Sequence, residues 1–294
     1  MNCFERNITR ITAPGFLQSA VAQHEHRFAL RTLLINNVDD RVAARELAAA
    51  AVARGEIDRF AFVDEYVDSA LKKTGLRLRD FGRYLHWSDC CLVALALPGP
   101  EWLCYVDVDL TLRSRGDWVA EALEAMAGDP RIGVANPNWR MSDGSSSVGR
   151  EADESGPGWF KGYGFTDQIF LCRRATFARP LLSRWRPLGL TSPASLRWAA
   201  YQLPFATSSL FFEQIIDAFM RRNRIMRLTL TEREFEPIPM SAYPVTGVYE
   251  RIMARIGSRW LGLLTAGRRR VPHLFQAPTL RTTGLLDPEF SGRN

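Results

Sequence analysis

Short apolar runs alternate with longer helix-forming segments along most of the chain. The apolar runs typical of buried strands span residues 28–35, 59–63, 102–106, 132–135, 165–173 and 225–230. The predicted helices span residues 41–54, 80–97, 118–127 and 209–222. Strands and helices that alternate in this way predict an α/β fold, with a mainly parallel, Rossmann-like sheet flanked by helices.

The same pattern divides the chain into three parts. Residues 1–27 show weak periodicity and are expected to be a lead-in, residues 28–236 form the α/β domain, and residues 237–294 form a C-terminal extension. Within the domain, residues 142–164 are rich in Gly, Ser and acidic side chains. A segment of this length without a periodic pattern predicts a long loop, either a functional lid or disordered.

Composition excludes several classes of protein. The 294 residues are 46% apolar and 24% charged, which is ordinary globular usage and argues against a disordered or collagen-like chain. The five cysteines are an odd number without CxxC spacing, which argues against a disulfide framework and a zinc ribbon. No apolar run approaches the length of about 18 residues that a membrane-spanning helix needs. A cytoplasmic protein is expected.

The net charge of +6 is a property of the C-terminal segment. Residues 251–294 hold eight Arg and two acidic residues, so residues 1–250 are balanced and give no support to a nucleic-acid partner. Residues 251–270 interleave Arg with Trp and Leu. This stretch is expected to pack on the domain with its Arg side chains outward; the alternative is peripheral contact with the inner face of an anionic membrane.

Polar residues follow the first three predicted strands. They are Asn37 and Asp39 after the first strand, Asp64 after the second, and Asp107 with Asp109 after the third. One such Asp is ordinary turn or helix-cap chemistry, but three acidic strand ends are harder to explain in that way. Parallel α/β sheets bind ligands beyond the carboxyl ends of their strands. The sequence therefore predicts a ligand site at this edge.

The sharpest motif is YVDVDLTL at residues 105–112. Its two carboxylates, Asp107 and Asp109, stand two residues apart at a strand end, where both can turn toward one divalent cation. Hard oxygen ligands suit Mg²⁺ or Mn²⁺, and a cation held there can bridge a diphosphate and neutralise the charge on a departing nucleoside diphosphate.

With these motifs in this order, the sequence resembles the family 2-like glycosyltransferases of the GT-A fold. The resemblance covers about residues 27–236 and is carried by FAFVDEYVDSA (60–70), YVDVDLTL (105–112) and FFEQIIDAFMRRNRIMRLTL (211–230). Two positions depart from the family pattern. Gln214 replaces the second acid of the helix pair, and INNV replaces the usual PxYN after the first strand.

The resemblance implies a role for each matching residue. The nucleotide-sugar contacts fall on Asn37, Asp39, Asp64 and Asp107, and the metal ligands on Asp107 and Asp109. Glu213 matches the general base that deprotonates the acceptor hydroxyl. Asp167 is the reserve base on a separate ground, since it lies between the predicted loop and a strand.

The implied function is sugar transfer in glycan biosynthesis, dependent on Mn²⁺ or Mg²⁺. The donor is a nucleotide-diphosphate sugar, with a UDP-sugar favoured, and the acceptor is a glycan, a lipid-linked glycan or a small molecule. Transfer with inversion is favoured because it needs one base on the acceptor side.

Two alternatives stay open. DVDLTL at residues 107–112 also resembles the nucleophile motif of haloacid dehalogenase-type phosphatases, in which Asp107 would attack phosphorus and Asp109 would act as acid and base. That chemistry needs a later Lys and an acidic pair for Mg²⁺, and the one Lys after residue 112 is Lys161, inside the predicted loop. The second alternative is a catalytically silent nucleotide-sugar-binding domain, since Gln214 cannot accept a proton.

Overall fold

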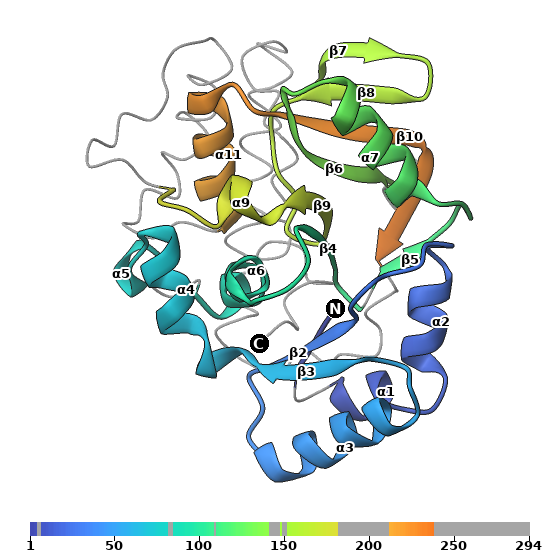
Figure 1. Ribbon diagram of the computed structural model, residues 1–294, viewed down its shortest axis with the longest axis vertical. Coiled ribbons are helices and arrows are strands. Elements are labelled where there is room, and N and C mark those ends of the chain that lie inside the picture. The colour runs from blue at the N-terminus through green and yellow to red at the C-terminus, as the bar shows by residue number, and fades with distance from the viewer. Residues whose placement is uncertain are drawn as a thin grey trace, which may run out of the picture.

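The computed structural model describes residues 1–4, 7–81, 85–108, 110–140, 148, 152–181 and 212–237 (Figure 1). The strands are β1 (Asn2–Phe4), β2 (Thr32–Asn36), β3 (Arg59–Phe62), β4 (Trp102–Val106), β5 (Leu110–Leu112), β6 (Ile132–Trp139), β7 (Ala152–Gly156), β8 (Trp159–Gly162), β9 (Ile169–Arg173) and β10 (Met226–Pro237). The helices are α1 (Ile8–Ile11), α2 (Phe16–Ala22), α3 (Arg41–Ala53), the 3-10 turn η1 (Val63–Glu65), α4 (Val67–Thr74), α5 (Leu78–Phe81), α6 (Leu85–Ala96), α7 (Trp118–Gly128), α9 (Arg174–Phe177) and α11 (Phe212–Asn223).

The strands form a parallel part and a mixed part. The parallel part has the order β1-β2-β3, and the mixed part has the order β4-β9-β6-β10-β8-β7, with β5 paired to β10. A parallel bridge between Asn2 and Asp107 joins the two, so β1 lies between β2 and β4. The carboxyl ends of β1 to β4 therefore meet at one edge.

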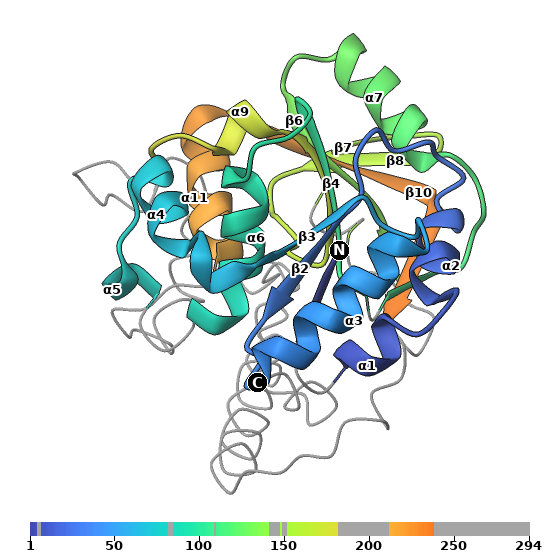
Figure 2. The ribbon, with the colours of Figure 1, turned by 60° about the horizontal axis from the view of Figure 1, so that its bottom comes forward.

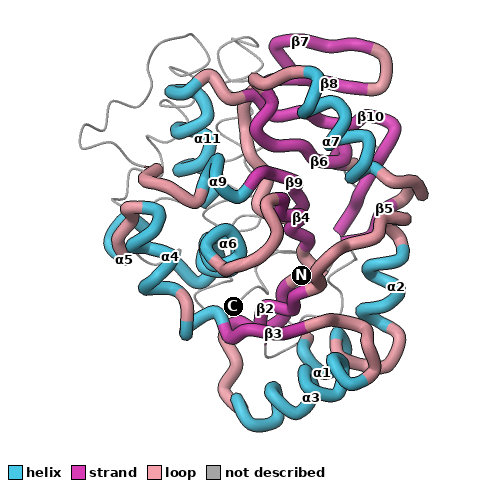
Figure 3. Tube along the Cα trace, in the orientation of Figure 1, coloured by secondary structure: helices cyan, strands magenta, loops and turns pink. Residues whose placement is uncertain are grey.

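Helices cover both faces of the sheet, as Figures 2 and 3 show. On one face, α4, α6 and α11 pack against β4 and β9 in a large apolar cluster. On the other face, α1, α2 and α3 cover β2 and β3, and α7 covers β6, β9 and β10. Alternate residues of each strand supply the two faces, for example Tyr105 to the first and Val106 to the second, as a pleated strand requires.

The helix and strand pattern is confirmed over the middle of the chain. β4 has the predicted bounds, and α3, β3 and α7 match their predictions to within one residue. The side chain of Asp40 accepts a hydrogen bond from the Ala43 backbone N–H and begins α3, while Asp117 does the same for α7. These short acidic side chains are favourable helix caps, so the boundaries follow from the local sequence.

The structure corrects three expectations. Residues 1–27, expected to be a lead-in, supply β1, α1 and α2, with Cys3, Ile8 and Leu17 buried. Residues 152–162, expected to be loop, form the hairpin β7–β8, which pairs with β10. The sheet is mixed rather than mainly parallel, because β9 runs antiparallel to β4 and β6.

The C-terminal expectations lie outside the described residues. These are the extension of residues 237–294, apart from Pro237 itself, and the basic stretch 251–270. Across the described ranges, no helix is long and apolar enough to cross a membrane.

We expect the fold to depend on the burial of α6. Replacing Leu92, which is fully buried, by Ala should lower the free energy of unfolding by about 2–5 kcal/mol, because the truncation leaves a cavity in the packed cluster. The same change at Leu78, which is 53% exposed, should cost about 0.5 kcal/mol or less. Urea denaturation of both variants measures this, and equal losses would contradict the central position of α6.

Candidate functional site

The polar residues predicted from the strand ends do lie along one edge of the sheet. Because β1, β2 and β3 are parallel and Asn2 bridges to Asp107 in parallel, β4 ends at the same edge. Asn37 and Asp39 follow β2, Asp64 follows β3, and Asp107 follows β4. Asp109 is outside the described residues.

Asp107 is a buried carboxylate that accepts a hydrogen bond from a neutral donor. Asp107 is only 5% exposed. The Tyr105 hydroxyl donates a hydrogen bond to the Oδ1 atom of Asp107 at 3.0 Å. Its backbone N–H donates to the carbonyl of Gln168 at 2.7 Å. Burial raises the pKa of the Tyr105 phenol well above its ordinary value, so this phenol stays a proton donor. The contact from Tyr105 therefore orients Asp107 without cancelling its charge.

Asp167 and Glu213, the two candidate bases, are direct neighbours. The backbone N–H of Asp167 donates to Oε1 of Glu213 at 3.1 Å, and Asp167 directly precedes Gln168, the residue bonded to Asp107. A short path of contacts thus links β4, the start of β9 and the first turn of α11. Asp167 and Glu213 are partly exposed, whereas Gln214 is buried at 3%.

Asp64 lies at the surface and is paired with Arg41. The guanidinium of Arg41 donates to Asp64 and, at 2.5 Å, to Glu65, and it stacks over the ring of Phe62 at 4.3 Å. Asp64 is 67% exposed, so this is an ion pair that water screens and a ligand can exchange.

The turn after β2 holds Asn37 and Asp39, both exposed. Asn37 has a left-handed backbone with φ of 47°, which Asn tolerates better than most residues. Asp40, rather than Asp39, caps the amino end of α3. Helix capping therefore explains the acidic residue at position 40 and does not explain Asp39.

Sequence reasoning missed one acidic residue at this edge. Asp89, on α6, is 6% exposed, and its Oδ1 accepts a hydrogen bond from the Asn36 amide at 2.7 Å, at the end of β2. Burial raises the pKa of Asp89 to about 7, and the hydrogen bonds from Asn36 and the Cys90 backbone offset this only in part. The signal was present as a lone Asp within the apolar run SDCCLVALAL (88–97).

Helix α6 connects the parts of the site. The Ser88 hydroxyl oxygen accepts from the Phe212 N–H at 3.1 Å at the start of α11, and Asp89 holds Asn36. The Cys91 thiol donates to the Asp167 carbonyl at 3.2 Å. Three side chains from little more than one turn of helix therefore fix three separate segments.

The described residues supply one well-oriented carboxylate for a cation, Asp107. Within these ranges no three His, Cys, Asp or Glu side chains lie close enough together to hold a metal ion. The oxygen chemistry of Asp107 fits Mg²⁺ or Mn²⁺, and the second ligand expected from the sequence is Asp109. A site of this kind, with few protein ligands, suits a cation that is shared with substrate phosphates.

Comparison with known proteins assigns no family to this chain. No family model matches the chain, and no curated protein matches it. Among solved structures, the apo form of mouse xyloside xylosyltransferase 1 matches with a TM-score of 0.37 and 16% sequence identity, over 79% of this chain and 82% of that chain.

The burial of Asp89 gives stability a specific pH dependence. Its folded pKa of about 7 lies above the ordinary value of 3.8, so the folded state binds this proton more tightly and loses stability as pH rises toward 7. Asp89→Asn keeps the Oδ1 acceptor and cannot ionise. Its melting temperature relative to wild type should therefore rise between pH 5 and pH 8, because the wild type loses about 1.4 kcal/mol of unfolding free energy for each pH unit between pH 5 and the folded pKa of about 7.

Thermal unfolding of both proteins across this range measures the difference. Asp68→Asn, at an exposed position on α4, is the matched control and should give a difference that does not change with pH. A flat difference for Asp89→Asn as well would mean that Asp89 is already ionised in the folded state near pH 5.

Proposed function

We propose that the protein is a metal-dependent glycosyltransferase of GT-A type, which transfers a sugar from a nucleotide-diphosphate sugar to an acceptor hydroxyl. The observation that carries this proposal is the line of contacts from Asp107 through Gln168 and Asp167 to Glu213. It brings a buried carboxylate at a strand end close to two carboxylates suited to proton transfer. Sugar transfer from a diphosphate needs these two functions side by side.

In this proposal, Asp107 and Asp109 hold Mg²⁺ or Mn²⁺, which supplies positive charge to the departing diphosphate. Asp39 and Asp64 hold the base and ribose of the donor, with Asn37 beside them. The exposed pair of Asp64 with Arg41 leaves Asp64 open to exchange its partner for a ribose hydroxyl. A UDP-sugar is the favoured donor, and pocket shape rather than motif sets the sugar and the acceptor.

Glu213 is the proposed base. Its Oε1 accepts the Asp167 N–H, which fixes the carboxylate in place, and this carboxylate is proposed to take the acceptor proton. Asp167 is the reserve, since it lies directly beside Glu213. One base on the acceptor side is what transfer with inversion requires, so inversion stays the favoured stereochemistry. The acceptor class and a peripheral membrane contact through residues 251–270 are further proposals.

The phosphatase alternative gains no support from the position of Lys161. Its Nζ pairs with Asp129 at 2.8 Å and lies 4.5 Å from the ring of Trp159. Asp129 precedes the amino end of β6, and β6 runs parallel to β4, so Lys161 lies at the opposite edge of the sheet from Asp107. It is not placed to assist a phosphoryl group at Asp107.

The metal pair can be tested by Asp107→Asn and Asp109→Ala. Both should abolish Mn²⁺-dependent binding of a UDP-sugar and lower the transfer rate on the order of 100-fold or more, because the cation loses a ligand that stabilises the leaving diphosphate. Thermal shift with a nucleotide-sugar panel and release of nucleoside diphosphate measure the two effects. Asp68→Asn is the exposed control and should behave as wild type.

Normal sugar transfer by Asp109→Ala would disprove the metal assignment. Phosphate release from a phosphomonoester, without any turnover of nucleotide sugars, would support the phosphatase instead. Metal-dependent binding of a nucleotide sugar without turnover would support the silent binding domain.

The base is tested by Glu213→Gln, which keeps the oxygen that accepts the Asp167 N–H. This variant should bind the donor with wild-type affinity and transfer sugar about 10²–10⁴-fold more slowly, because the amide cannot take the acceptor proton. Glu124→Gln, at an exposed position on α7, is the matched control. Wild-type transfer by Glu213→Gln together with an inactive Asp167→Asn would assign the base to Asp167.

A further inference from the structure

Two arginines of α3 lie over one phenylalanine ring at the carboxyl end of β3. The guanidinium carbon of Arg41 is 4.3 Å from the centre of the Phe62 ring, and that of Arg45 is 5.0 Å from it. Phe62 is only 2% exposed, whereas the side chain of Arg41 is 38% exposed and that of Arg45 is 57% exposed. The ring is therefore buried, and the two cations next to it remain in contact with water.

Carboxylates hold Arg41 in this position together with the ring. Its guanidinium donates to Asp64 and, at 2.5 Å, to Glu65. A guanidinium is planar and donates its hydrogen bonds in that plane, so contacts of this kind occupy its edge and leave its faces for stacking. Arg41 thus uses its edge for the carboxylates, lies over Phe62, and has exposed area left for a second planar group.

The charges around Arg41 do not favour a phosphate at this position. Asp39 and Asp40 directly precede α3, Asp64 and Glu65 directly follow β3, and all four side chains are exposed. Four carboxylates therefore lie close to the two arginines. A phosphate would meet this excess of negative charge, whereas an uncharged ring would not be repelled.

The position of Arg41 along the sheet edge suits one end of a nucleotide. Asp64 follows β3 and Asp107 follows β4, with β2 and β1 between these strands. Neighbouring strands lie about 4.8 Å apart, so three steps separate the two strand ends by about 14 Å. This spacing suits an extended nucleoside diphosphate. A base at Arg41 places the diphosphate toward Asp107, where the cation is proposed, and the ribose beside the turn after β2.

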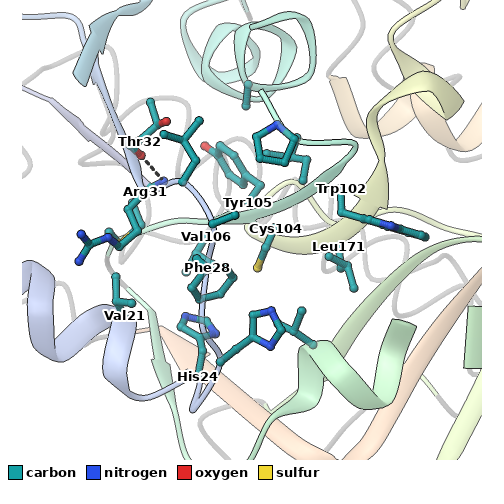
Figure 4. A pocket seen from close by; sticks show the side chains of 18 of the residues that line it. Val21, His24, Phe28, Arg31, Thr32, Trp102, Cys104, Tyr105, Val106 and Leu171 are labelled. Atoms are coloured by element: carbon teal, nitrogen blue, oxygen red, sulfur yellow. Dashed lines mark hydrogen bonds between the residues drawn. The ribbon is translucent and has the colours of Figure 1, made fainter. Parts of the chain in front are cut away.

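The cavity shown in Figure 4 does not offer the base a comparable place. It has a volume of about 300 Å³, and most of its lining is apolar, with Phe28, Val106 and Leu171 among the lining residues. None of the residues proposed to hold the nucleotide sugar lines it. A base bound there would lack the contact with Asp64 that the proposed function requires.

We propose that Arg41 is the stacking platform for the nucleobase of the donor, with Phe62 supporting the guanidinium from the other side. Asp64, which the proposed function assigns to the base and ribose, lies at the edge of the same guanidinium. Every base has a flat π-face, so the platform supplies affinity without selecting one base. This inference rests on the proposed sugar transfer, because it assumes a nucleotide donor.

Arg41→Lys tests the platform in the full chain. Lysine keeps the positive charge that pairs with Asp64 and Glu65, but it has no plane on which a base can stack. In the presence of Mn²⁺, the Kd for UDP should rise about fivefold, as expected for one cation–π contact at an exposed position. The Kd for inorganic pyrophosphate should not change, because this probe has no base. Isothermal titration calorimetry measures both constants.

Arg10→Lys is the matched control. Arg10 is also exposed and lies over a phenylalanine ring, that of Phe16 at 5.9 Å, but it belongs to α1, which carries none of the candidate site residues. Its two Kd values should equal those of wild type.

Two results would overturn the platform. One is wild-type affinity of Arg41→Lys for UDP. The other is an equal loss of affinity for UDP and for pyrophosphate, because Arg41 would then bind phosphate rather than the base. A wild-type protein that does not bind UDP with Mn²⁺ would contradict the proposed function itself, and the platform with it.

Discussion

The candidate site depends on the complete burial of one stretch of helix α6. Ser88–Leu95 are all buried, and eight residues make more than two turns, so no side of this stretch faces water. Any polar group it carries must find a partner inside the protein. With 3.6 residues per turn, Ser88 and Cys91 share one face, toward α11 and the start of β9, while Asp89 points about 100° away, toward β2. The apolar burial that fixes α6 therefore also fixes these three segments.

The acidic residues at this edge belong to two different environments. Asp64 is exposed and shares Arg41 with Glu65, an arrangement that contributes little stability and can change with a ligand. Asp107 is buried and accepts a hydrogen bond from a phenol whose pKa is raised, so a neutral group contributes to its orientation. A carboxylate oriented in this way is prepared for a cation, because little has to rearrange when the cation arrives.

Whether the sequence predicts a strand or helix depends on how many residues its hydrophobic pattern covers and on how clear its caps are. β4 and Asp107 were found because a five-residue apolar run ends directly in acidic residues, and α3 and α7 because their caps are clear. The three residues of β1 are too few to show a period of two, so the strand that joins the two halves of the sheet could not be seen.

Asp89 was hidden for a related reason. A single acidic residue does not change the hydrophobic character of a ten-residue apolar run, and its partner, Asn36, lies 53 residues away in the chain. Glu213 and Asp167 could be found as candidates from their types and positions, but their contact could not, because it joins the backbone of one to the side chain of the other across 46 residues. Contacts of this kind come from the packing of α11 beside α6, which no local pattern records.

Strand β4 connects the apolar core to the candidate site. At its carboxyl end, Asp107 lies in the candidate site, and two residues earlier the Tyr105 hydroxyl donates to Asp107. The ring of Tyr105 stacks on the ring of Phe170 of β9, with 5.1 Å between the ring centroids. β4 pairs with β9 along its length and packs against α6 on one face, so the position of β4, and with it the direction of the Tyr105 hydroxyl, depends on both contacts.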